Sequence, residues 1–169
     1  VFLSGNGPLV EVLQYELRAA GGDGKTFVRG VKDYVTRYAR RATAVPPEHV
    51  LVFDEAQRAF DAAMMREKHG AHAAGSEPEQ FVAFADRIPE WCVVVALIGS
   101  GQEIHVGEEG GIGQWRAAVE TAARRAEWTV HVPPGLAASF ADGAVPCEVD
   151  PALHLDVELR FHVARDLHG

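Results

Sequence analysis

Short apolar runs alternate along the chain with longer segments that have helical periodicity. The apolar runs have the length of strands and cover residues 1–4, 49–53, 91–98 and 128–132. The segments with the apolar spacing of amphipathic helices are residues 9–20, 28–43, 76–88 and 112–126. This alternation is typical of α/β proteins with a mostly parallel sheet. Because residues 91–98 are continuously apolar, we expect helices to cover both faces of that sheet.

Local signals indicate where two of the helices begin and end. Pro8 suits the first turn of a helix, where its missing N–H leaves no bond unmade, and residues 21–24 are rich in glycine and end the same helix. Ser76 and Glu79 have the spacing of a capping box, which predicts a helix start at this point.

Three segments have a weaker pattern. Residues 62–75 mix Met, Lys, His, Ala and Gly, and we interpret them as a mobile insertion. Residues 99–113 form a long glycine-rich loop, and residues 145–161 have an extended, alternating pattern. No internal repeat is present in the sequence.

The composition predicts one globular domain with a sizeable core. The chain has 169 residues, of which 47% are apolar. It carries 16 basic and 24 acidic residues, and this net charge of −8 argues against a generally polybasic nucleic-acid binder. A local basic stripe is compatible with it, and the segment 28–43 has one face with Arg29, Lys32, Arg37 and Arg40. That face is either a solvated outer face or a contact with nucleic acid.

Cysteine usage and apolar run lengths indicate a cytoplasmic protein without membrane contact. Two cysteines are too few for a disulfide framework or a four-cysteine zinc site, which fits a reducing compartment. The longest apolar run, residues 91–98, is far too short to span a bilayer. The chain opens directly on a strand without an initiator methionine, so we expect it to be an internal segment of a longer protein.

Two carboxylates follow the apolar strand that ends at Phe53. Asp54 and Glu55 would emerge at the carboxyl end of a buried parallel strand, which is the edge where open α/β sheets bind ligands. Carboxylate oxygen suits a hard cation such as Mg²⁺, and a second acid can act as general base toward water. The alternative is a pair of solvent-facing acids at a helix amino terminus, where acids are favoured for electrostatic reasons.

The segment 24–26 has the letters Gly-Lys-Thr that end a phosphate-binding loop. Five residues before Gly24 stands Ala19 and not glycine, and the segment follows a predicted helix. A phosphate loop must leave a strand and open a helix so that its amides point at the anion. We therefore interpret residues 24–26 as a helix stop.

The residues 54–57, Asp-Glu-Ala-Gln, resemble the second Walker motif of superfamily-one DNA and RNA helicases. Residues 1–10 are similar to the strand and turn after the first nucleotide-binding helix, and residues 97–104 resemble the motif that senses the terminal phosphate. Residues 107–111 with Trp115 extend the similarity to an uncharacterised family of helicase-like ATPases. Residues 155–160 are similar to the segment whose arginine reaches the nucleotide from the second motor domain. The resemblance implies an incomplete, three-layer RecA-like P-loop NTPase core of the α/β class with a mostly parallel sheet.

The resemblance also implies roles for individual residues. Asp54 would hold Mg²⁺, Glu55 would orient and deprotonate the attacking water, and Gln102 would contact the terminal phosphate of ATP. Arg160 would be an arginine finger, an effect on the order of 10³–10⁵ in rate. The nucleotide would also contact Gln57 and Arg58, which complete the acidic motif.

The resemblance further implies how the chain is organised and what binds it. Residues 1–150 would be part of a motor domain and residues 151–169 the start of the connection to a second one. Partners would be Mg-ATP and the remainder of the parent protein, with single-stranded nucleic acid as a further candidate.

In this family the phosphate loop precedes the strand at residues 1–4, so the chain would hold half of a catalytic centre and be inactive alone. Because the strand before that loop is central in the fold, its absence should leave a gap in the sheet, and we expect either weak stability or closure of the gap by another segment. Two alternatives remain open. One is a degenerate nucleotide-fold module for interaction or regulation, and the other is a nuclease or other magnesium enzyme that uses Asp54, Glu55 and Glu103.

Overall fold

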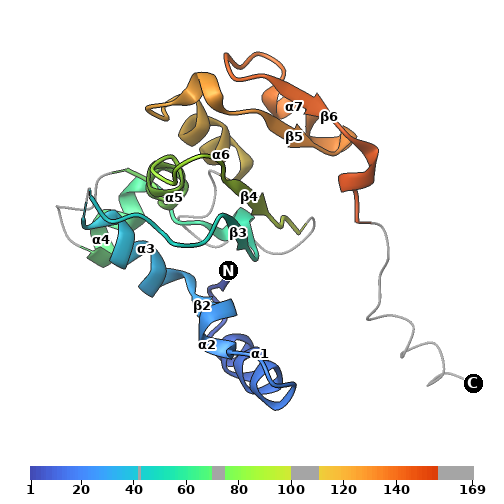
Figure 1. Ribbon diagram of the computed structural model, residues 1–169. Coiled ribbons are helices and arrows are strands. Elements are labelled where there is room, and N and C mark those ends of the chain that lie inside the picture. Colours follow the sequence, from blue (N-terminus) through green and yellow to red (C-terminus); the bar gives the residue numbers. More distant parts are fainter. Residues whose placement is uncertain (42, 70–74, 100–110, 156–169) are drawn as a thin grey trace, which may run out of the picture. The chain divides into compact units, whose positions relative to one another are not determined.

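The computed structural model describes residues 1–41, 43–69, 75–99 and 111–155 (Figure 1). The chain divides into two compact units, Val1–Glu127 and Trp128–Gly169. The boundary that we predict between residues 150 and 151 separates the motor domain from the connection to a second motor domain. It is a different boundary from this division into compact units, and it stays a prediction.

The first unit contains a four-stranded sheet in which every pairing is parallel, with the order β2-β1-β3-β4. Its strands are β1 (Phe2–Ser4), β2 (Val28–Gly30), β3 (Val50–Phe53) and β4 (Val93–Ala96). Its helices are α1 (Gly7–Ala19), α2 (Gly24–Phe27), α3 (Val31–Ala39), α4 (Ala62–His69), α5 (Glu77–Ala85) and α6 (Gly111–Glu120), with 3-10 turns η1 (Ala56–Arg58) and η2 (Arg125–Glu127). The predicted α/β class, with an incomplete RecA-like core and a mostly parallel sheet, is confirmed.

Aromatic side chains form the core on one face of this sheet. Phe53 of β3 stacks on Phe81 of α5 with 5.5 Å between ring centroids, and Trp115 of α6 meets Phe53 edge-on at 5.6 Å. Tyr34 of α3 packs against Phe84 of α5 at 5.7 Å. Helices α3, α5 and α6 therefore cover the face that carries Phe53.

The opposite face of β3 and β4 carries exposed valines. Val50 pairs in register with Val93, and Val52 pairs with Val95, so these four residues lie on the face away from Phe53. Val50, Val93 and Val95 are 41%, 46% and 36% exposed. The expectation that helices cover both faces is therefore wrong for this part of the sheet.

The predicted gap in the sheet is absent among the described strands. β3 pairs with β1 on one side and with β4 on the other, from Val50 opposite Val93 to Phe53 opposite Ala96. β4 lies directly beside β3, which corresponds to the alternative that we named, closure of the gap by another segment, and β4 is the last strand in the order of the described sheet.

Two predicted elements differ from the structure. Residues 28–30 pair with β1 as strand β2 instead of opening the helix, which begins at Val31, because pairing with the buried β1 overrides the local helical pattern. Arg29 therefore does not belong to the basic helix face, and it forms an ion pair with Glu48 at 3.3 Å. Residues 62–69 are the helix α4, where we predicted a mobile insertion, and residues 70–74 lie outside the described part.

The other predicted helices and strands are confirmed, with ends that shift by a few residues. The capping box is present, because Ser76 Oγ accepts from the Glu79 N–H at 3.3 Å and Glu79 accepts from the Ser76 N–H at 2.6 Å. These two bonds satisfy amide groups that the first turn of a helix leaves without a partner.

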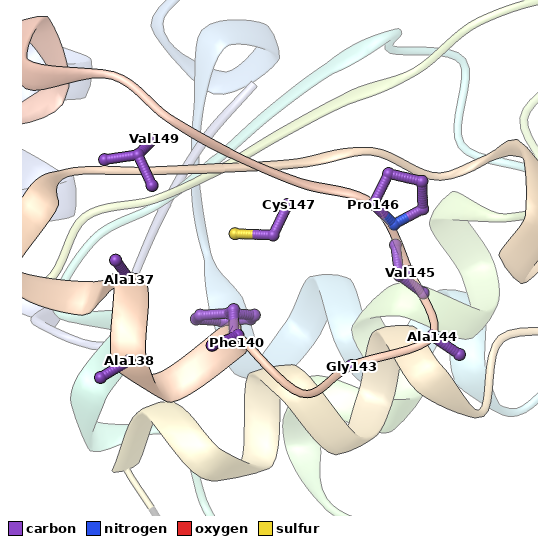
Figure 2. Close-up of a pocket in the computed structure, with 10 residues that line it drawn as sticks. Ala137, Ala138, Phe140, Gly143, Ala144, Val145, Pro146, Cys147 and Val149 are labelled. Atoms are coloured by element: carbon purple, nitrogen blue, oxygen red, sulfur yellow. The ribbon is translucent and has the colours of Figure 1, made fainter.

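The second unit has a two-stranded parallel sheet of β5 (Val130–Val132) and β6 (Cys147–Val149) with α7 (Ala137–Phe140) between them in sequence. The 3-10 turn η3 (Pro134–Leu136) directly precedes α7, and the 3-10 turn η4 (Pro151–Leu153) follows β6. Figure 2 shows an apolar pocket in this unit, with the Cys147 thiol pointing into the space beside Phe140. Across the described residues, the helices are all too short or too polar to cross a membrane.

Candidate functional site

The sheet carries Asp54 to its carboxyl edge. Leu51 and Phe53 bury their side chains on the aromatic face, and the pairing with β1 continues one residue beyond β3, because the Asp54 N–H donates to the Leu3 carbonyl at 2.8 Å. The backbone of Asp54 is thus fixed by the sheet, and its carboxylate leaves the end of the strand.

The carboxylate of Asp54 is bound by a neighbouring strand. Ser4, the last residue of β1, donates its hydroxyl to Asp54 Oδ2 at 3.0 Å. The same hydroxyl oxygen accepts the Asn6 N–H at 3.1 Å. Ser4 is buried and Asp54 is half-buried. Oδ2 of the carboxylate is therefore committed to Ser4, and Oδ1 has no hydrogen bond from a described residue.

Glu55 follows with a left-handed backbone, at φ 55° and ψ 42°. Its carboxylate forms an ion pair with Arg58 at 2.9 Å, and the two side chains are 37% and 38% exposed. A pair this exposed contributes little to stability because water screens it. Its effect is to hold the Glu55 carboxylate beside the turn η1, within reach of solvent.

The loop that contains both acids is fastened to β4. The Ala56 N–H donates to the Leu97 carbonyl at 2.8 Å, and the Gly99 N–H donates to Gln57 Oε1 at 3.0 Å. Gly99 is the residue at which the glycine-rich loop begins.

The same loop is fastened to α6. The indole N–H of Trp115 donates to the Ala56 carbonyl at 2.8 Å, in a buried position, and Gln114 Nε2 donates to the Ala59 carbonyl at 3.4 Å. The acidic loop is therefore held at both flanks by the elements that precede and follow the glycine-rich loop.

Two polar atoms at this loop are buried without a hydrogen bond to any described residue. They are the amide nitrogen of Gln57 and the amide oxygen of Gln114. Buried polar groups in native proteins usually have a partner, so this donor and this acceptor are atoms that a ligand or water would satisfy.

The residues present fit a magnesium ion that is bound together with a phosphate ligand. Among the described residues, no group of three or more His, Cys, Asp or Glu side chains could hold a metal by itself. Mg²⁺ in nucleotide sites keeps several waters and takes one or two carboxylates plus phosphate oxygens. The single oriented carboxylate of Asp54 suits that arrangement.

The segment 24–26 is the helix α2, which follows α1 and leads into β2. Its amides are already used, since Lys25 N–H and Thr26 N–H both donate to Asp23 Oδ1. Bonds from the Thr26 hydroxyl and backbone also hold the pKa of the Asp23 carboxyl below its ordinary value. A Cβ at Gly24 would lie 2.2 Å from the Gln14 carbonyl oxygen, so this glycine permits close packing of α2 on α1.

Several predicted site residues lie outside the described part of the chain, namely Gln102, Glu103 and Arg160. The structure brings together Asp54, Glu55, Gln57 and Arg58 on one loop. Sequence reasoning missed Ser4, which looked like one more residue of an apolar strand. Its role depends on the register between β1 and β3, and the sequence carries no direct signal of that register.

The fold and the acidic loop together define an α/β core of the RecA-like type with a polar site at the carboxyl edge of its sheet. The family model described as Schlafen group 3, DNA/RNA helicase domain, matches residues 1–169, and the chain belongs to this family. No curated protein and no solved structure matches the chain. The resemblance to a helicase-like family is thereby confirmed at the level of the domain.

Proposed function

We propose that the chain is part of an ATP-hydrolysing, helicase-like motor or switch domain that binds Mg-ATP at the carboxyl edge of the sheet. The observation that carries this proposal is the acidic loop, in which a buried parallel strand presents Asp54 and Glu55 side by side. Asp54 is oriented by Ser4 and Glu55 remains in reach of solvent. Membership of a DNA/RNA helicase domain family supports the same function.

In this proposal each residue of the loop has a separate task. Asp54 holds the hydrated Mg²⁺, which when bound neutralises charge on the phosphates. Glu55 accepts a proton from the attacking water, and its side chain is 37% exposed. The buried amide nitrogen of Gln57 donates a hydrogen bond to the nucleotide. Arg58 contacts the nucleotide when Glu55 binds the attacking water. Gln102 and Arg160 contact the terminal phosphate.

The open edge of β4 and the exposed valines support a phosphate loop that precedes residue 1. In the strand order β2-β1-β3-β4, the connection from β1 through α1 leads to β2, on the side of β1 opposite to β3. A strand beside β4 that connects to β1 would run in the same direction. Since such crossovers are right-handed, its helix would lie on the same face as α1. The helix would cross the exposed Val50, Val93 and Val95. The added strand would therefore cover the open edge of β4, and the added helix would cover these valines.

We also propose single-stranded nucleic acid as a partner, on the family's description and on the exposed basic side chains of α3. Lys32, Arg37 and Arg40 are exposed on that helix. They supply local positive charge in a chain whose net charge is −8.

The decisive variant is Glu55→Gln in the longer protein that carries the phosphate loop. The amide keeps the size of the side chain and loses the base, so we expect ATP binding to persist and phosphate release to fall at least 100-fold. Binding of a fluorescent ATP analogue and release of phosphate measure the two properties. Normal turnover by Glu55→Gln would remove Glu55 from the role of base.

The same assay tests the other parts of the proposal. The chain of residues 1–169 alone should release no phosphate, because the described part offers no cradle for a triphosphate. Added single-stranded DNA or RNA should stimulate the longer protein if nucleic acid is its partner.

A degenerate nucleotide-fold module is the second candidate, and it is favoured by the observation that the Lys25 and Thr26 amides are already occupied by Asp23. A longer protein that neither binds nor hydrolyses Mg-ATP would support this candidate and contradict the motor.

A further inference from the structure

Ser4 occupies a position between two strands and the start of a helix. It is 2% exposed and ends β1. The register that pairs Leu3 with Phe53 brings the following residues, Ser4 and Asp54, opposite each other at the carboxyl edge. Their side chains meet there through the 3.0 Å hydrogen bond.

The Ser4 hydroxyl takes part in a second hydrogen bond, which does not use its proton. A serine hydroxyl has a single proton and two acceptor sites. The Asn6 N–H donates to Ser4 Oγ at 3.1 Å and so occupies an acceptor site. The proton of Ser4 is left for Asp54, whose Oδ2 accepts it. Asn6 is itself held, because its side chain caps α1 by accepting from the Leu9 N–H.

We infer that Ser4 is a positioning residue, which holds the Asp54 carboxylate by Oδ2 so that Oδ1 faces the metal ion. This inference rests on the proposed function, since it assigns Ser4 a task toward the Mg²⁺ that Asp54 would bind. Without the hydroxyl, the half-buried carboxylate can rotate about its side-chain bonds, and each metal-binding event must restrict that rotation again. Hydrogen-bond partners of metal ligands commonly contribute 10- to 100-fold in metal affinity or activity.

A purely structural role is the competing explanation, in which Ser4 ties β1 to β3 and nothing more. The two explanations differ in what the loss of the hydroxyl changes. A structural tie changes stability alone, whereas a positioning residue changes how strongly nucleotide binding depends on Mg²⁺.

The test compares Ser4→Ala, Ser4→Thr and Ser76→Ala in the longer protein. Ser76→Ala is the matched control, because it also removes a buried serine hydroxyl and lowers stability through the lost cap of α5. The affinity for a fluorescent ATP analogue is measured across a Mg²⁺ titration and also without the metal. Hydrolysis is measured across the same titration.

We expect Ser4→Ala to raise the half-saturating Mg²⁺ concentration about 10-fold or more, with the metal-free nucleotide affinity unchanged. Ser4→Thr keeps the hydroxyl and should show the wild-type Mg²⁺ dependence. Ser76→Ala should show it as well. If Ser4→Ala does not fold, Ser4→Cys replaces it, because a thiol is similar in size and a poor donor. The same rise in Mg²⁺ requirement is then expected.

Wild-type Mg²⁺ dependence in folded Ser4→Ala or Ser4→Cys would overturn the role of Ser4 alone. A wild-type protein whose nucleotide binding needs no Mg²⁺, or which binds no nucleotide, would contradict the proposed function and with it this role.

Discussion

Glu55, whose side chain we propose as the general base, adopts a backbone conformation that non-glycine residues rarely adopt. A left-handed residue with a Cβ is less stable than glycine in that conformation by roughly 1–2 kcal/mol. Strain of this kind persists when the surroundings enforce it, and here the hydrogen bonds of Ala56 and Gln57 fix the loop to Leu97 and Gly99.

Replacement of Glu55 by glycine and by alanine separates this strain from the ion pair with Arg58. Both variants lose the ion pair, and only glycine relieves the strain. We expect Glu55→Gly to be more stable than Glu55→Ala by about 1 kcal/mol in urea denaturation. Equal stabilities would mean that the loop relaxes without Glu55 and that the conformation stores no strain.

Helix α6 acts on the acidic loop from a distance of about sixty residues in sequence, through one buried hydrogen bond. Trp115 donates to the Ala56 carbonyl, and that oxygen is enclosed between η1 and α6. The ring also packs on Phe53 and Phe81, so the same side chain serves the core and the site.

Substitution Trp115→Phe keeps most of the ring contact and removes the donor. The Ala56 carbonyl then keeps only the 3.4 Å hydrogen bond from the Ala59 N–H, and the loss of the indole donor should reduce the free energy of unfolding by about 0.5–1.5 kcal/mol. Denaturation followed by circular dichroism measures this change. Trp91→Phe is the control, since Trp91 is largely exposed and should change stability by no more than about 0.5 kcal/mol.

The sequence was sufficient for the elements that have strong local signals and insufficient for those that depend on distant pairing. The acidic strand and the capping box at Ser76 were predictable, because a run of apolar residues and a pair of polar residues at fixed spacing determine them. Strand β2 was not predictable, because residues 28–30 continue a helical pattern and only the neighbouring β1 makes them a strand. The contact between Ser4 and Asp54 depends on the same kind of non-local pairing.

For the whole molecule, the uneven cover of the sheet is the feature with the widest consequences. One face carries the aromatic core, whereas the other leaves valines of β3 and β4 in contact with water. Parallel sheets are ordinarily buried on both faces, so this surface is suited to a further layer of structure.

Val93→Thr distinguishes a surface that is covered in the longer protein from one that stays in water. In residues 1–169 alone the added hydroxyl meets solvent, and stability should change by no more than about 0.5 kcal/mol. In the longer protein the hydroxyl would be buried without a partner, at a cost of about 1–3 kcal/mol. Val94→Thr, which faces the aromatic side, should destabilise both proteins. Equal effects of Val93→Thr in the two proteins would contradict the proposed covering helix.

The parallel topology also governs when the sheet can assemble during synthesis. β1 pairs with β3, whose first residue lies 46 positions after Ser4, and the last strand ends only at Ala96. At synthesis rates of 5–20 residues per second, the ribosome needs about 5–20 s to make the 96 residues that complete the four strands. The side of β1 that pairs with β3 must stay unpaired for part of that time. A strand made before β1 that pairs with β4 would wait longest, because its partner is made last. The nascent chain is therefore exposed to misassociation before its site exists, and chaperone access in that interval becomes part of how the domain reaches its folded state.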